Sequence, residues 1–69
     1  MDMKSFKEGL IHAIYTAQAE RDMADVMFAD EKLQRVYKAA AANLIVMLID
    51  EIVIQCGEDN LIELQTKYL

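Results

Sequence analysis

Apolar residues between positions 31 and 56 recur at helical spacing and form two stripes. Apolar side chains three or four residues apart share one face of an α-helix, so this segment predicts a helix over residues 31–56. One stripe, here called the long stripe, follows the whole segment and consists of Leu33, Tyr37, Ala40, Leu44, Met47 and Ile54. The other, here called the short stripe, occupies only the later half and consists of Ile45, Ile49, Ile52 and Cys56.

The short stripe predicts a local contact, because the matching face of the earlier half is polar, with Gln34, Arg35 and Lys38. A second copy of the chain is the simplest partner for such a contact. We therefore expect an all-α homodimer in which two helical hairpins form a four-helix arrangement. The expected dimer interface consists of Ile45, Ile49, Ile52, Val53 and Cys56.

The N-terminal segment predicts an amphipathic helix over residues 4–28, followed by a turn at residues 29–31. Asp30 is a favourable N-cap, and Glu31 then falls in the first turn of the next helix, where the helix dipole favours a negative charge. This turn gives two arms of about 25 residues each, and it brings the alanines at 39–42 against small residues of the first arm. The alternative is one uninterrupted helix of about 45 residues, because no Gly or Pro lies between residues 10 and 56. We expect the antiparallel hairpin.

The second helix is predicted to end at Cys56-Gly57, since Gly57 can adopt a left-handed conformation. Asn60 and Glu63 then have the spacing of a capping box, which predicts a short C-terminal helix over residues 60–67. A continuous helix through Gly57 is the alternative, because Met47, Ile54, Leu61 and Tyr68 are spaced seven apart.

The length of 69 residues indicates one domain. Below about 70–80 residues the hydrophobic core of a single chain rarely contributes more than about 3–5 kcal/mol to folding stability, so oligomerisation is expected. A single cysteine favours a reducing compartment. No signal peptide is recognised, and the run 44–54 is shorter than the ~20 residues that cross a bilayer. We expect a cytoplasmic protein that does not enter a membrane.

The formal net charge of −5 argues against nucleic-acid binding, which relies on Lys and Arg near the phosphates. An acidic block at residues 20–31 precedes a basic block at residues 32–38, so the two would face each other in a hairpin. The expected ion pairs are Asp25 with Arg35 and Asp22 with Lys38. A second acidic block, residues 50–63, has no basic counterpart.

No catalytic motif is recognised, and we expect a protein that is not an enzyme and binds no cofactor or metal. Glu8 and His12 share a helical face, but the Glu-x-x-His motifs and additional carboxylates of di-iron bundles are absent. Cys56 has no base near it in the sequence and is expected to be an inert thiol.

Two groups of residues are candidates for contact with a partner protein. Met23 and Met27 lie near the expected turn together with Val26 and Phe28, and their flexible thioether side chains can adapt to a partner. Tyr37 lies on the long stripe, where it either packs in the core or contacts a partner. The acidic group consists of Asp50, Glu58, Asp59 and Glu63. These carboxylates either serve solubility alone or compete for the basic face of a DNA-binding or nucleotide-binding protein.

The acidic helical chain, with AERDMADVMFADEKLQRVYKAAAANLIVML at its centre, resembles the quorum-sensing anti-activators of Pseudomonas phages. The resemblance rests on length, charge and helix layout over the full chain. It implies a compact dimer of helical hairpins in the host cytoplasm. It also implies binding to the DNA-binding domain of a LuxR-type regulator such as LasR, which blocks contact with DNA, and inhibition of the type IV pilus assembly ATPase. A secretion chaperone or a dimerisation and adaptor module is the alternative that the sequence leaves open.

Overall fold

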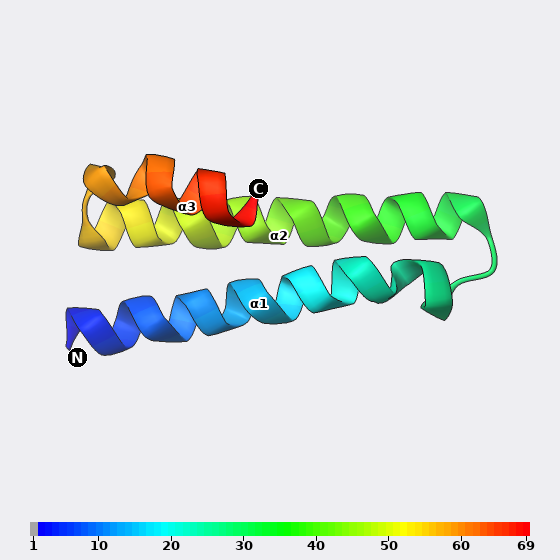
Figure 1. The fold of residues 1–69 in the computed structure, drawn as a ribbon, viewed down its shortest axis with the longest axis horizontal. Coiled ribbons are helices and arrows are strands. Elements are labelled where there is room, and N and C mark those ends of the chain that lie inside the picture. The colour runs from blue at the N-terminus through cyan, green and yellow to red at the C-terminus, as the bar shows by residue number, and fades with distance from the viewer. Residues whose placement is uncertain (1) are drawn as a thin grey trace.

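The computed structural model describes residues 2–69, which form an elongated helical hairpin of 42 × 20 × 15 Å (Figure 1). Helix α1 spans Met3–Met27 and helix α2 spans Glu31–Cys56. A 3-10 turn, η1, spans Glu58–Asn60, and helix α3 spans Leu61–Tyr68. The two long helices run antiparallel, and α3 folds back along the later half of α2 (Figure 1). The predicted hairpin is thus confirmed.

Local capping explains why the chain turns instead of continuing as one helix. The backbone of Phe28 is extended (φ −124°, ψ 130°), so α1 stops there. Asp30 also has an extended backbone, and its Oδ1 accepts a hydrogen bond of 2.7 Å from the N–H of Lys32. Gln34 reaches back and donates from Nε2 to the Phe28 carbonyl at 2.6 Å. The expected N-cap role of Asp30 is confirmed, and it fixes the start of α2.

Contacts near the turn differ from the expected ion pairs. Lys38 pairs with Asp25 at 2.8 Å, whereas Asp22 lies 3.7 Å from Arg21. The register of the two helices thus brings Asp25 beside a residue three positions, about one helical turn, after Arg35. Both ion pairs are solvent-exposed, and exposed pairs contribute only about 0–1 kcal/mol.

The hydrophobic core lies at the end of the hairpin where three helices meet. Helix α1 contributes two of its residues, α2 three and α3 two. They are Ile14, Ala17, Ile45, Ile49, Ile52, Leu64 and Tyr68. Towards the turn the hairpin is only two helices thick, and the buried residues there are the small Ala24 and Ala41. The stability of the fold is therefore concentrated in the half that contains α3.

The short stripe of α2, which the sequence assigned to a contact with a second chain, is buried within one chain. Ile45, Ile49 and Ile52 of the short stripe are fully buried inside a single chain, and Cys56 is half-buried against them. Most of the long stripe is open to solvent instead, with exposed fractions between 46% and 71% at Leu33, Leu44, Met47 and Ile54. The reason is α3, which with α1 covers the short stripe from within the chain.

The connection to α3 depends on Gly57 and Asn60. Gly57 has φ 120° and ψ 149°, which breaks the helix and rules out continuation through this position. The expected capping box does not form. The side chain of Asn60 instead donates to the carbonyls of Cys56 (3.4 Å) and Gly57 (3.0 Å), and its Oδ1 accepts from Lys7 Nζ at 2.6 Å. Asn60 thus joins the end of α2 to the first turns of α1.

The other end of α3 is held by contacts with α1. The ring of Tyr68 packs edge-on against the ring of Tyr15, with centroids 5.5 Å apart. Tyr68 donates its hydroxyl hydrogen to the Tyr15 hydroxyl at 3.4 Å, and Gln18 Nε2 donates to the Tyr68 carbonyl at 3.3 Å. These contacts hold the C-terminal end of α3 against α1.

Substituting Gly57 with alanine should destabilise the chain by about 1–3 kcal/mol, because this backbone conformation is essentially restricted to glycine. A Cβ added there would also lie 2.7 Å from Asp59 Oδ1. Gly9→Ala is the matched control, since nothing lies within 4 Å of its added Cβ in the interior of α1. The free energy of unfolding of Gly9→Ala should be about 0.5–1 kcal/mol higher than that of the wild type. The measurement is urea unfolding of both variants. Midpoints that shift in the same direction would contradict the special role of Gly57.

Candidate functional site

The described residues, 2–69, contain no group of three or more His, Cys, Asp or Glu side chains positioned to hold a metal ion. Glu8 and His12 are both exposed on α1. Cys56 is a free thiol, half-buried against the core.

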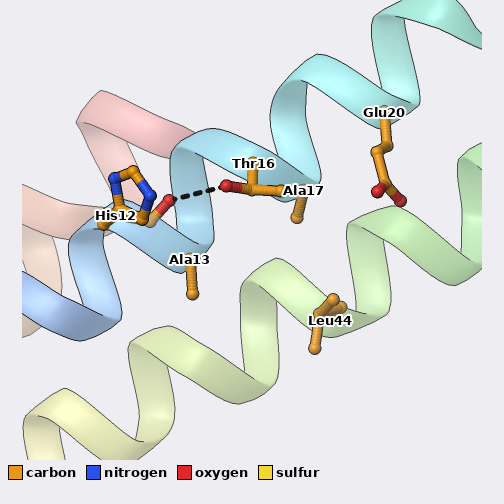
Figure 2. Close-up of a pocket in the computed structure, with 6 residues that line it drawn as sticks. All are labelled: His12, Ala13, Thr16, Ala17, Glu20 and Leu44. Carbon is orange, nitrogen blue, oxygen red and sulfur yellow. Dashed lines mark hydrogen bonds between the residues drawn. The ribbon is translucent and has the colours of Figure 1, made fainter.

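An open groove runs between α1 and α2 (Figure 2). It has a volume of about 330 Å³ and is lined by His12, Ala13, Thr16, Ala17, Glu20 and Leu44. Ala13, Ala17 and Glu20 point from α1 towards α2, where Leu44 lies (Figure 2). The Thr16 hydroxyl donates to the His12 carbonyl at 3.2 Å, so it is already satisfied. Small and apolar side chains line the centre of the groove, which suits it to receive apolar side chains.

The groove lies on the side of the hairpin that α3 leaves uncovered. Along α1, the residues that contact Tyr68 are Tyr15 and Gln18. Helical geometry places these two residues on the opposite edge of the buried face from Ala13 and Glu20. One side of the hairpin is therefore covered by α3, and the other side remains open.

The residues expected to form a dimer interface belong largely to the interior of one chain. Ile45, Ile49 and Ile52 are core residues, while Val53 and Cys56 are half-buried and pack against that core. In this fold a second chain could not reach the three isoleucines without displacing α1 or α3. The dimer itself remains a prediction, and the surface available for it is a different one.

A second apolar surface lies on the last two turns of α1, close to the turn. Val26 is 85% exposed, and Met23 and Met27 are each about half exposed. We call these three residues the tip patch. The sequence directed attention to Met23, Val26, Met27 and Phe28. The structure places the first three on an accessible surface, whereas Phe28 is half-buried against Tyr37.

Tyr37 is half-buried and holds the two helices together near the tip. Its ring packs against Phe28, with centroids 5.2 Å apart, and its hydroxyl donates to Glu20 Oε2 at 2.9 Å. The hydrogen bond to Glu20 raises the pKa of Tyr37, since the carboxylate favours the protonated phenol. Much of its capacity for partner contact is therefore already used within the chain.

The acidic candidates Asp50, Glu58, Asp59 and Glu63 are all exposed, but the structure does not bring them to the tip patch. Residues 58–63 lie around η1, at the end of the molecule opposite the turn (Figure 1). The carboxylates nearest to the tip patch in sequence are instead Asp22, Asp25 and Asp30. Sequence proximity to the turn could have identified these residues, which also belong to the acidic block at 20–31.

Helix α2 is long and apolar enough to cross a membrane, judged by length and composition alone. The run 44–54, on which the expectation of a protein outside the membrane depends, is shorter than the whole helix. A core helix can have the same length and composition, and one face of α2 is packed against α1 and α3, but only 17% of its apolar stretch is buried within one chain.

Comparisons with protein-family models, with curated proteins and with solved structures find no match to this chain. Its function is therefore argued from its own surfaces. Three of them are relevant: the tip patch, the groove between α1 and α2, and the exposed long stripe.

Proposed function

We propose that this chain is a non-enzymatic inhibitor that binds a host transcriptional regulator of the LuxR type and blocks its contact with DNA. The resemblance to phage anti-activators supports the class of partner. The tip patch supplies the contact surface, and it is the observation on which the proposal depends. The same resemblance extends the proposal to a second target, a pilus assembly ATPase.

The tip patch has the properties of a surface that binds another protein. Val26 and Met27 come three and four residues after Met23, so both lie beside it on the surface of α1. Val26 is too exposed to contribute to the core, and contiguous exposed apolar surface often marks an interaction site. Unbranched, polarizable methionine side chains adapt to the shape of a partner.

Charge around the tip patch is acidic on α1 and at the turn, and Lys32, Arg35 and Lys38 at the start of α2 offset most of it, as the ion pair between Lys38 and Asp25 shows. The small remaining acidic excess favours a basic partner. In residues 20–31 the carboxylates of Glu20, Asp22, Asp25, Asp30 and Glu31 outnumber the single guanidinium of Arg21. A DNA-binding face is rich in Lys and Arg because it must neutralise phosphates. Attraction between an acidic surface and such a face accelerates association and weakens as salt screens it.

Substituting Val26 with glutamate should weaken inhibition at least tenfold, because the partner would have to bury a new charge within an apolar contact. The assay is a gel shift in which the purified chain releases DNA from a LuxR-type regulator. Ile62→Glu is the matched control: Ile62 is 76% exposed on α3, at the other end of the molecule, and its substitution should leave inhibition unchanged. Circular dichroism should show both variants to be helical.

Two outcomes of the gel shift would overturn the proposal. One is that the regulator keeps its DNA at saturating concentrations of the chain. The other is that Val26→Glu and Ile62→Glu inhibit equally. Binding that resists salt and requires an apolar helix from the partner would instead indicate the chaperone or adaptor alternative, for which the open groove is the matching feature.

A further inference from the structure

We infer that the long stripe of α2 is the contact face for a second copy of this chain, packed antiparallel so that its side chains enter the groove between α1 and α2. This surface is distinct from the tip patch on α1, and the inference does not depend on the protein that the tip patch binds. It transfers the expected dimer contact from the buried short stripe to the exposed long stripe.

The spacing of the long stripe is that of a helix–helix interface. Leu33, Tyr37, Ala40, Leu44 and Met47 follow one another at alternating intervals of four and three residues, and Ile54 comes one heptad after Met47. This average of 3.5 residues is the repeat with which two helices pack along their length. The stripe extends for about 30 Å of a molecule 42 Å long, at a rise of about 1.5 Å per residue. Within one chain its large aliphatic side chains remain accessible.

The groove continues the same surface on to α1. Leu44 belongs both to the long stripe and to the lining of the groove, opposite Ala13 and Ala17. The opposite side of the hairpin is already closed by α3, so a helix from a second copy would complete the packing on the open side. The small alanines leave room for a large side chain such as Leu44 of a second copy (Figure 2).

Side-chain size makes the long stripe complementary to itself in the antiparallel direction. A two-fold axis near Leu44 would place Ala40 of one copy opposite Met47 of the other, and Leu33 opposite Ile54. Contacts in a symmetric dimer are reciprocal, so each such pair occurs twice. A parallel arrangement would instead stack Met47 on Met47 and leave Ala40 facing Ala40.

Charge selects the same orientation. Glu51 lies on the long stripe between Met47 and Ile54. An antiparallel pair would place Glu51 of each copy near Tyr37 of the other copy, away from the other Glu51. A parallel pair would bring Glu51 against Glu51, and like charges repel most strongly where water is excluded. The occupant that fits this pattern is therefore another α2.

The first experiment measures the oligomeric state by sedimentation equilibrium over a wide concentration range. The wild-type chain should sediment at about twice its mass of 7.9 kDa. Met47→Lys should raise the dimer dissociation constant at least 100-fold while the helical signal remains. Ile62→Lys, at an exposed position outside the long stripe, should change the constant no more than about twofold. A wild-type monomer at millimolar concentration, or equal constants for the two variants, would overturn the inference.

The second experiment tests orientation and does not require a stable variant monomer. In a Cys56→Ala background, Ala40→Cys combined with Met47→Cys should form disulfide-linked dimers on mild oxidation, and each single variant should not. The two cysteines of one chain cannot bridge, since they are two helical turns, about 10 Å, apart and a disulfide requires Cα atoms within about 7 Å. Linkage by the single variants would show a parallel pair, and absence of linkage by the double variant would show another occupant; either result contradicts the antiparallel dimer.

Discussion

Substituting Ile49 with lysine should unfold the chain and not merely dissociate a dimer. Ile49 is 1% exposed and lies at the centre of the core, between α1 and α3. Truncating such a side chain to alanine costs about 2–5 kcal/mol, and burying an unpaired ammonium adds to that cost. A chain of this length has a total stability of about 3–10 kcal/mol. Circular dichroism should therefore show loss of most helical signal at 25 °C.

Two other isoleucines provide matched controls for the same substitution. Ile54→Lys changes an exposed residue of the long stripe and should remain helical while weakening the dimer. Ile62→Lys changes an exposed residue of α3 and should leave both helicity and association unchanged. If Ile49→Lys instead gave a well-folded monomer, the three-helix core would be wrong and the short stripe would be the dimer interface after all.

The hairpin was predictable because its determinants are local. The carboxylate of Asp30 caps α2 from within two residues, and Gly57 ends the same helix at the position where the sequence offers a glycine. Such capping signals lie within a few residues of the helix end that they define, so the local sequence is enough to predict them. The observed helices begin and end within a residue or two of the expected limits.

The identity of the buried stripe was not predictable in the same way. Hydrophobic periodicity shows that α2 has two apolar faces, but it does not show which neighbour covers each face. The choice depends on α3, which returns over Ile49 and Ile52 because Asn60 and Tyr68 attach it to the long helices. Those attachments join residues that are 50 or more positions apart in the sequence, as in the pair Lys7–Asn60.

The candidate partner surface was predicted in part for a related reason. Met23 and Met27 were placed near the turn by sequence position, and the turn itself is local, so their exposure followed. Tyr37 was a candidate for partner contact, but its hydroxyl is hydrogen-bonded to Glu20. Glu20 lies on the other long helix, so the sequence around Tyr37 does not reveal this contact. The acidic group at 50–63 was separated from the tip patch by the length of α2, which sequence position alone already implies once the hairpin is accepted.

Substituting Tyr68 with alanine should release α3 and destabilise the chain by about 3–5 kcal/mol, the range for large aromatic residues in cores. Tyr68 is buried at the C-terminal end of α3, packs against Tyr15 and accepts a hydrogen bond from Gln18 through its carbonyl. Without the ring, the eight residues of α3 would retain few contacts with α1. Hydrogen exchange should show loss of protection in residues 61–68 first, and urea unfolding should report the change in stability.

Tyr68→Phe is the control that keeps the ring and removes only the hydroxyl. Burial, followed by the hydrogen bond to Tyr15, raises the pKa of Tyr68 to about 12. A tyrosine of the unfolded chain ionises near pH 10, whereas the folded chain keeps Tyr68 protonated up to a higher pH. The contribution of Tyr68 to the free energy of unfolding is therefore fully present below pH 10 and is lost as the pH rises towards 12. Tyr68→Phe should therefore be close to wild type at pH 7 and lose less stability than wild type between pH 10 and 12. An alkaline unfolding profile identical to that of wild type would show that Tyr68 does not hold its proton in the folded chain.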